Sequence, residues 1–361
     1  MAKIDAFFKL LHEQRASDLH MVSGSPPVFR VRGSLKRIKY KVLENDELKA
    51  MLYEVAPEYK IKVFEETGDV DFGYEIPGLA RYRANFFMQK NGIGAVFREI
   101  PSKIMTSEQL GLPDVMTKLA MLPRGLILVT GPTGSGKSTT LAAIIDHANR
   151  NRNDHIITIE DPIEFVHESK GCLVNHREVG SHTKSFSAAL RGALREDPDI
   201  IMVGEMRDLE TISLAIEAAM TGHLVMATLH TISAAMTVDR VIEIFPAHQQ
   251  AQIRSTLSDA LRAVISQTIF KRIDIKGRCV AFEILIATPA VRNLIRERKT
   301  YQLQSAMQTG RKFGMSTLDD AIMGLMQKNW IDPDEAYNKC VDKEKFRPFA
   351  RSAPADFTEV G

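Results

Sequence analysis

The chain has 361 residues, which is too long for one average domain, so the sequence predicts two or three domains. Its 44% hydrophobic and 25% charged residues are typical of a soluble globular protein, and a formal net charge of +2 gives no support for an extended nucleic-acid-binding surface. Three dispersed cysteines with no CxxC pair indicate neither a zinc ribbon nor a disulfide framework.

Neither a signal peptide nor a membrane-spanning helix is expected. The chain begins Met1-Ala2-Lys3-Ile4-Asp5, without a basic start and a long apolar stretch. The strand-like run over 125–130 is far shorter than the ~20 apolar residues of a spanning helix. We therefore expect a cytoplasmic protein that can still dock on a membrane protein.

Residues 1–100 predict a small α+β domain. Helical spacing of apolar residues is followed by alternating, strand-like patterns, with turns at Pro77-Gly78 and Asn91-Gly92. This arrangement favours an antiparallel meander with helices beside it. The expected elements are a helix over 4–15, a strand over 28–32, a helix over about 45–66 and three strands within 69–100.

A proline-bounded linker, 101–124, with one short helix is expected next. From 125 the pattern becomes strand, loop and helix in repetition, which is typical of a mainly parallel α/β sheet with helices on both faces. Helices are expected again in the C-terminal part of this domain, which runs to 346. The tail 347–361 has few large apolar residues and is predicted to be frayed and flexible.

The segment from Gly131 to Ser138 matches the phosphate-loop pattern G-x4-G-K-S, with an apolar strand before it and a helix after it. Its glycines let the backbone approach phosphate oxygens, and the helix N-terminus adds positive potential. Lys137 is expected to reach the β- and γ-phosphates and Ser138 to bind Mg²⁺, so the sequence predicts ATP with magnesium. The expected binding residues are Gly131, Pro132, Thr133, Gly134, Ser135, Gly136, Lys137, Ser138 and Thr139.

Hydrolysis also needs an acid at the end of a neighbouring strand. The apolar run 200–203 leads to Gly204 and Glu205, with glycine where the common form of this motif has Asp. We therefore expect Glu205 to contact magnesium, through water, to act on the attacking water, or to do some of both.

Two further groups are candidates at strand ends. The run 156–159 leads into Glu160, Asp161 and Glu164, of which Glu160 and Glu164 are predicted to be catalytic; the alternative is a solvated strand end. His230 follows a buried strand over 224–229 and is expected near the γ-phosphate as a sensor, because ligands bind at the carboxyl ends of parallel strands.

Together these stretches resemble the secretion-type motor ATPases, most closely the type IV pilus retraction ATPases, over nearly the whole chain. The C-terminal stretch 290–297 is similar to a helix motif of the retraction ATPases. The four-cysteine zinc insert and the longer N-terminal domain of the assembly ATPases are missing, which favours retraction, although an accessory retraction paralogue stays an alternative. The other similar motifs are 16–20 (the N-terminal signature), 131–139 (Walker A), 159–164 (Asp box), 195–208 (Walker B) and 222–231 (His box).

The resemblance implies a ring homohexamer of subunits with a PAS-like N-terminal and a RecA-like C-terminal domain, and ATP between them. It also implies an inner-membrane platform protein as partner, on which the motor drives pilus retraction. Arg81, Arg83 and Arg98 alternate with apolar residues. Of these three, Arg81 and Arg98 are the predicted candidates to stabilise the transferring phosphoryl group on domain closure. The alternative is a solvated basic face.

Two other functions remain open from the sequence. A nucleotide-dependent structural switch with weak hydrolysis is suggested by the missing Asp at position 204. A nucleic-acid translocase is disfavoured by the near-neutral charge and by the absence of an aromatic and basic groove.

Overall fold

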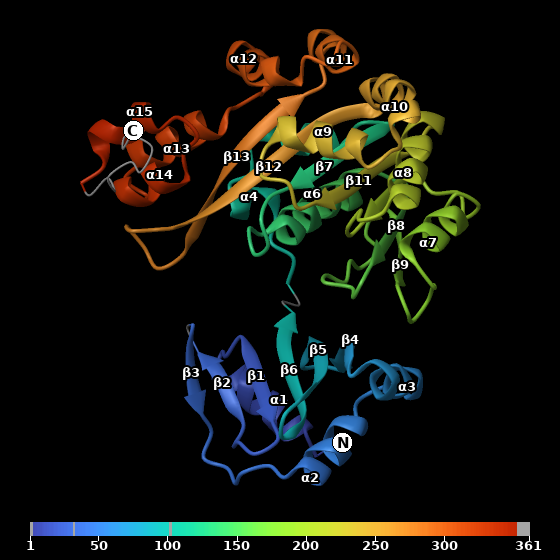
Figure 1. Ribbon diagram of the computed structural model, residues 1–361, viewed down its shortest axis with the longest axis vertical. Helices are drawn as coiled ribbons and strands as arrows, with labels where there is room; N and C mark the ends of the chain where they lie inside the picture. Colours follow the sequence, from blue (N-terminus) through green and yellow to red (C-terminus); the bar gives the residue numbers. More distant parts are fainter. Residues whose placement is uncertain (1–2, 32, 101–102, 352–361) are drawn as a thin grey trace. The chain divides into compact units, whose positions relative to one another are not determined.

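The computed structural model describes residues 3–31, 33–100 and 103–351. The chain divides into two compact units, Met1–Ile104 with Asp161–Val166, and Met105–Glu160 with His167–Gly361 (Figure 1). Of the tail predicted to be frayed, 352–361 lies outside the described residues, and Arg347–Phe349 forms a 3-10 turn.

The N-terminal unit contains a six-stranded antiparallel sheet of order β3-β2-β1-β6-β5-β4. Along β5 buried and half-buried residues alternate from Ala80 to Phe87, so one face of the sheet packs in the core. The ring of Phe8 on α1 stacks on Tyr82 with centroids 4.3 Å apart. The elements are α1 (Asp5–Glu13), β1 (Asp18–Val22), β2 (Val28–Val31), β3 (Ser34–Arg37), α2 (Asn45–Tyr53), α3 (Glu58–Thr67), β4 (Asp69–Ile76), β5 (Ala80–Gln89) and β6 (Gly92–Ile100).

The structure corrects two element predictions. The single helix expected over 45–66 is two helices, because Pro57 precedes α3 and the residue before a proline is disfavoured in the helical conformation. The linker contains two short helices instead of one, α4 (Ser107–Leu110) and α5 (Asp114–Ala120). A capping box between Thr106 and Gln109 starts α4.

The C-terminal unit is built on a seven-stranded mixed sheet of order β13-β12-β7-β11-β10-β8-β9. All neighbouring strands are parallel except the β12–β13 hairpin at one edge, which the sequence pattern did not predict. The central strand β7 is buried at every position, as expected for a parallel strand covered on both faces. The strands are β7 (Gly125–Thr130), β8 (His155–Glu160), β9 (Leu173–Glu178), β10 (Ile200–Val203), β11 (Leu224–Leu229), β12 (Leu261–Lys271) and β13 (Arg278–Ile286).

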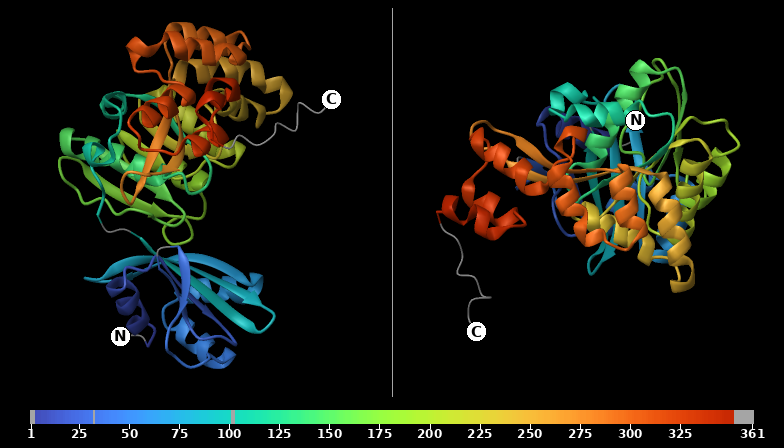
Figure 2. Two further views of the ribbon diagram at one scale, coloured as in Figure 1. Left: turned by 90° about the vertical axis from the view of Figure 1, so that its left-hand side faces the viewer. Right: turned by 90° about the horizontal axis from the view of Figure 1, so that it is seen from above.

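Helices cover both faces of this sheet (Figure 2). One apolar cluster joins the strands to α7, α8, α9 and α10, and another joins them to α5 and α6. The fold class predicted from the sequence, an α+β domain followed by a mainly parallel α/β domain, is therefore confirmed. Besides α5, the helices that cover the two faces are α6 (Lys137–Asn151), α7 (Phe186–Ala193), α8 (Leu209–Thr221), α9 (Ala234–Glu243) and α10 (Ala247–Ala260).

Helices dominate the chain after β13, as the sequence predicted. Within the described residues, none of the helices is long and apolar enough to cross a membrane. These last elements are α11 (Pro289–Arg296), η1 (Thr300–Gln302), α12 (Leu303–Thr309), η2 (Arg311–Phe313), α13 (Leu318–Gln327), α14 (Pro333–Lys339), α15 (Lys343–Phe346) and η3 (Arg347–Phe349).

Candidate functional site

The phosphate loop connects β7 to α6, and three of its glycines have positive φ angles: Gly131 (+141°), Gly134 (+78°) and Gly136 (+87°). A Cβ atom on Gly131 would lie 2.5 Å from the carbonyl oxygen of Gln267. Only glycine fits this combination of backbone conformation and close approach. Lys137, Ser138 and Thr139 then form the first turn of α6, so the helix N-terminus faces the loop.

Polar side chains line the inside of the loop. The Nζ atom of Lys137 donates to the carbonyl oxygens of Gly131 (3.0 Å) and Pro132 (3.2 Å). The Oγ atom of Ser135 is buried and has no hydrogen-bond partner among the described residues. A buried hydroxyl of this kind normally has a partner, so the loop fits a phosphate group that would supply one.

Glu205 lies just beyond the end of β10 and is joined to the phosphate loop through His230. Its Oε1 atom is 3.0 Å from Nε2 of His230, whose Nδ1 atom is 3.5 Å from both Oγ1 of Thr133 and Nζ of Lys137. The other carboxylate oxygen accepts from Arg207 at 2.6 Å. This chain of contacts brings two residues predicted from separate motifs to the loop.

The charge of Glu205 is stabilised by these neighbours. Burial by itself would raise the pKa of the carboxyl group, but Arg207 and His230 outweigh burial and hold the pKa below its ordinary value. Glu205 is therefore an ionised acceptor at neutral pH. Together with Arg240 these three side chains line a pocket beside the loop.

The position of Gly204 explains why this chain has no Asp there. A Cβ atom at this position would lie 3.2 Å from the carbonyl oxygen of Ile159 and 3.4 Å from Cα of Glu160. The amide of Gly204 also donates to Ile159 O at 2.7 Å. The strand ends of β10 and β8 thus leave little room for a side chain at position 204, and the acid follows one residue later.

The predicted acidic cluster is divided between the two units. Glu160 ends β8 and is buried in the C-terminal unit, whereas Asp161–Val166, which includes Glu164, groups with the N-terminal unit. Only Glu160 is therefore placed in the same unit as the phosphate loop. The role of Glu164 stays a prediction.

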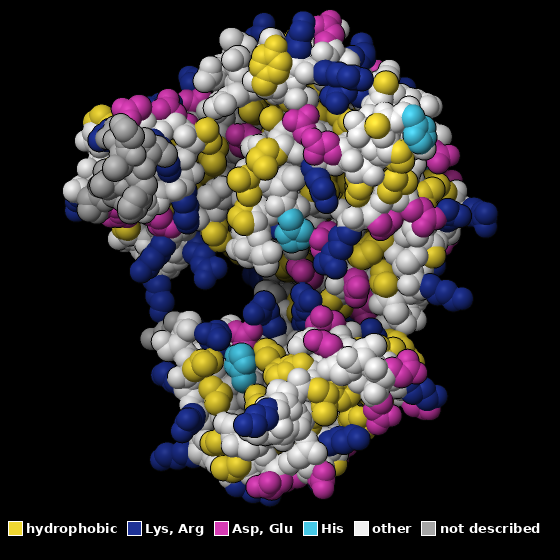
Figure 3. Space-filling model, viewed as in Figure 1, with side chains coloured by type: hydrophobic (Ala, Val, Ile, Leu, Met, Phe, Trp, Pro, Cys, Tyr) yellow, Lys and Arg dark blue, Asp and Glu magenta, His cyan; other side chains and the backbone are white. Residues whose placement is uncertain are grey.

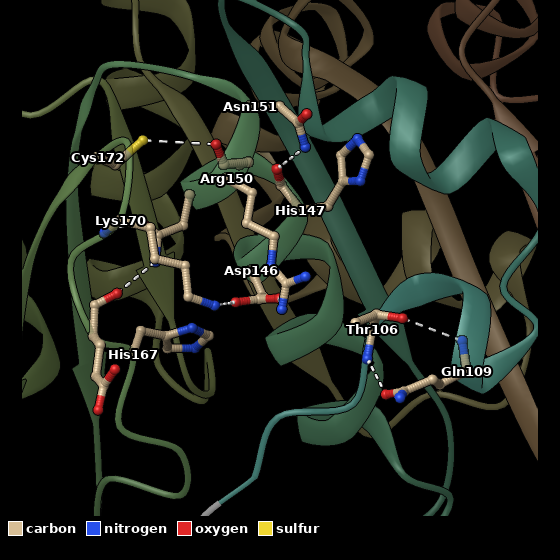
Figure 4. A network of polar contacts seen from close by, with 12 residues as sticks. Thr106, Gln109, Asp146, His147, Arg150, Asn151, His167, Lys170 and Cys172 are labelled. Atoms are coloured by element: carbon tan, nitrogen blue, oxygen red, sulfur yellow. Dashed lines mark hydrogen bonds and ion pairs between the residues drawn. The ribbon is translucent and has the colours of Figure 1, made fainter.

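The segment after this cluster is anchored on α6 (Figure 4). Asp146, buried in the middle of α6, pairs with Lys170 and with Arg150 at 2.8 Å. Asn149 donates to the carbonyl oxygen of Glu168 at 2.7 Å. The helix that begins at the phosphate loop therefore also holds the return of the acidic loop toward β9.

The predicted arginines lie in the N-terminal unit and pair with carboxylates of that unit. Arg98 donates to Asp18 at 2.8 Å and Arg81 to Glu75 at 3.4 Å. Arg98 is two-thirds exposed and Arg81 is one-fifth exposed at the side chain. Their contribution to phosphoryl transfer remains a prediction.

Sequence reasoning missed several residues of the site. Arg207 lies in the stretch 195–208 that resembles a Walker B region but was not predicted as a site residue, and Arg240 lies on α9 with no motif around it. Gln267, on β12, donates to Ser135 O at 2.5 Å and so fixes the back of the phosphate loop. Only strand order brings Gln267 to the loop, so no local pattern could have identified it.

A family model for type II/IV secretion system proteins matches residues 95–312. The chain belongs to this family. Among curated members, the type IV pilus retractation ATPase PilT of Pseudomonas aeruginosa PAO1 is 56% identical over 92% of this chain and 97% of its own length. A twitching motility protein of Neisseria gonorrhoeae is 48% identical over 93% of this chain and 92% of its own length.

The family resemblance extends to solved structures. The crystal structure of the pilus retraction motor PilT with bound ADP matches with a TM-score of 0.88 and 44% identity, covering 96% of this chain and 99% of that one. The type IV pilus ATPase PilU of P. aeruginosa PAO1 is less similar, at 38% identity over 92% of this chain and 87% of its own length. The predicted resemblance to retraction ATPases is confirmed.

Proposed function

We propose that this protein is an ATP-hydrolysing hexameric motor that drives type IV pilus retraction, and hence twitching motility, from the cytoplasmic face of the inner membrane. The observation that carries the hydrolytic part is the contact chain from Glu205 through His230 to Lys137 of the phosphate loop. The pilus part is supported by similarity to PilT over nearly the full length of both chains.

In the proposed reaction, the phosphate loop holds the triphosphate of ATP by its backbone amides and by Lys137. Ser138, and Glu205 through water, would hold magnesium, which would neutralise negative charge of the triphosphate. The ionised carboxylate of Glu205 accepts a hydrogen bond from the attacking water and orients it for in-line attack. His230, held by Glu205, reports the presence of the γ-phosphate.

Motion arises in this proposal from closure of the two domains on ATP. Arg81, Arg98, Glu160 and Glu164 would complete the site in the closed form, and an arginine that arrives on closure stabilises the transferring phosphoryl group. Hydrolysis and product release reopen the subunit and change the shape of the ring. The helix α11 passes this change to an inner-membrane platform protein.

Two alternatives are less well supported. The chain is 56% identical to PilT and 38% identical to PilU, which favours the main retraction motor over an accessory paralogue. On the face drawn in Figure 3, Lys and Arg side chains are interspersed with Asp and Glu instead of forming one basic expanse, which argues against a nucleic-acid translocase.

The test is twitching motility together with phosphate release in strains that carry Lys137→Ala or the control Lys276→Ala. Lys276 is an exposed lysine in the β12–β13 turn, away from the phosphate loop. We expect Lys137→Ala to abolish both activities and Lys276→Ala to keep both. Normal retraction with Lys137→Ala would overturn the motor function, and a wild-type protein that binds ATP without releasing phosphate would favour a structural switch.

A further inference from the structure

A bulge at the start of β12 displaces one arginine from the regular strand pattern. It lies at the end of the sheet opposite to the phosphate loop. In the parallel pairing with β7, Leu261 is opposite Leu126 and Ala263 is opposite Ile127, so Arg262 is the extra residue. Bulges redirect a side chain away from the regular alternation of a strand. The phosphate loop follows the last residue of β7, six residues away, which at ~3.3 Å per residue is about 20 Å.

The neighbouring strand is adapted to this arginine. Gly125, the first residue of β7, has a φ of +124°, and a Cβ atom there would lie 2.4 Å from Cγ and 2.7 Å from Nε of Arg262. The stem of Arg262 thus lies directly over the Gly125 backbone. Arg124, which is exposed, comes immediately before this glycine.

One residue ties Arg262 to a second arginine. The amide of Ala287 donates to the carbonyl oxygen of Arg262 at 2.9 Å, and the carbonyl oxygen of Ala287 accepts from Nε of Arg292 at 2.9 Å. Arg292 lies in the first turn of α11. The guanidinium group of Arg262 is held separately, because its Nη1 atom donates to the carbonyl oxygens of Asp259 (2.7 Å), Ala260 (3.3 Å) and Leu261 (3.2 Å) at the end of α10. Both guanidinium groups are therefore fixed by backbone carbonyls before any partner binds.

The three arginines act on one another electrostatically. Partial burial lowers the pKa of Arg262, and the charges of Arg292 and Arg124 lower it further. The carboxylate of Asp259 acts in the opposite direction, but it already pairs with Arg296 at 3.0 Å. Positive charge is concentrated here at a cost in stability that an anionic partner would offset.

We propose that Arg124, Arg262 and Arg292 form a preformed docking site for an acidic segment of a partner protein. Arginine forks bind carboxylates with two parallel hydrogen bonds, and fixed guanidinium groups lose little entropy on binding. The inference deepens the proposed function by giving the chemistry of a partner surface, and it rests on that function only for the assignment of the partner to the pilus machinery.

A protein segment fits this surface better than a membrane of anionic lipids does. The turn that leads into Arg124 exposes Met121, which is 41% exposed, and Pro123. Methionine and arginine are both enriched in protein interfaces. A basic lipid-binding surface is instead typically dense in lysine and arginine.

The test measures binding of a fluorescein-labelled hexaglutamate peptide to the full chain by fluorescence anisotropy. We expect Arg124→Glu and Arg292→Gln each to weaken binding roughly tenfold. The matched control, Arg278→Glu, changes an exposed arginine at the start of β13 and is expected to alter affinity by less than about twofold. Added salt should weaken wild-type binding and narrow the difference between the variants.

Three results would bear on the docking site in different ways. Equal weakening by Arg278→Glu and Arg124→Glu would show a general charge effect and overturn the proposal. Binding of phosphatidylglycerol vesicles that depends on Arg124, with none of the peptide, would replace the acidic protein by a membrane surface. ATP turnover is measured in parallel: if the wild type has none while peptide binding still depends on Arg124, the proposed function fails and the docking site stands.

Discussion

At the scale of single residues, Glu205 is held from both sides, by His230 at 3.0 Å and Arg207 at 2.6 Å. We predict that Glu205→Gln keeps ATP binding but lowers turnover ~10²-fold or more, because the amide is a much poorer acceptor for the attacking water. Phosphate release and nucleotide titration on the purified protein check this. Glu210→Gln, which alters a half-exposed surface pair with Arg191, is the control and should leave turnover unchanged. Loss of ATP binding by Glu205→Gln would instead assign Glu205 a structural role.

Gly204 gives a second prediction at this scale. Gly204→Ala adds a Cβ atom 3.2 Å from Ile159 O and should destabilise the protein by about 1–3 kcal/mol, since the strand ends must separate. Gly324→Ala is the matched control. Gly324 lies within α13, and apart from the backbone of that helix no atom of the described residues lies within 4 Å of an added Cβ, so alanine should stabilise the helix by about 0.5–1 kcal/mol. Denaturant unfolding compares the two, and equal effects would refute the steric account of Gly204.

The sequence identified those site residues that local motifs mark, and missed those that only strand order brings near. Glu205 and His230 stand at strand ends, where the rule for parallel sheets predicts a ligand. Gln267 and Arg240 reach the site through the order β12-β7-β11, which no single stretch of sequence encodes. The sequence alone does not show why Asp is missing at position 204, because the reason is the short distance from this position to the backbone of Glu160 on the neighbouring strand.

At the scale of secondary-structure elements, α8 begins directly after Glu205–Arg207 and depends on its N-cap. Asp208 accepts from the amide of Thr211 at 2.8 Å and from its hydroxyl at 2.7 Å. We predict that Asp208→Ala costs about 1–2 kcal/mol of unfolding free energy, because both donors of a buried residue lose their acceptor.

Asp208→Asn separates the cap from the charge. Asparagine caps helices about as well as aspartate, so this variant should keep most of the stability that the alanine variant loses. Urea unfolding of the three proteins measures the difference. If Asp208→Asn were as destabilised as Asp208→Ala, the contribution would come from the negative charge and not from the cap.

Helices and strands were predicted correctly where a hydrophobic pattern extends over a whole element. They were predicted wrongly where a proline ends a helix or where the direction of a strand depends on its partner. The parallel strands around the phosphate loop follow from unbroken apolar runs. Pro57 divides a segment whose composition looked continuously helical. The β12–β13 hairpin was missed because β12 is buried and continuous like its parallel neighbours, and only its pairing with β13 shows the antiparallel direction.

At the scale of the whole molecule, the acidic cluster shows how the two units share one stretch of chain. β8 ends at Glu160 in the C-terminal unit, Asp161–Val166 groups with the N-terminal unit, and the chain returns at His167. A sequence pattern treats these residues as one motif, whereas the structure divides them. His167, at which the chain re-enters the C-terminal unit, is buried, so the ionisation of its ring is linked to the stability of the fold.

His167 therefore gives a prediction for the pH dependence of global stability. Burial, together with the neighbouring charges of His176 and Lys170 and against that of Asp146, lowers its pKa from 6.5 to about 4. Its ring nitrogens have no hydrogen-bond partner within the described part of the chain. The folded protein thus keeps this ring neutral at pH values where the unfolded chain is already protonated.

The sign of the effect follows from this difference. Above pH 6.5 both states are neutral and the full stability is present; as pH falls from 6.5 toward 4 only the unfolded chain gains a proton, so stability is lost over that window, by about 3 kcal/mol at most. His167→Phe keeps a flat ring without a titrating group and should show a shallower fall. Urea unfolding at several pH values between 7 and about 4 measures both proteins. The difference between variant and wild type isolates His167 from all other titrating residues. If the unfolding free energies of the two proteins fell in parallel with pH, His167 would be protonated in the folded state near its ordinary pKa, and the prediction would be wrong.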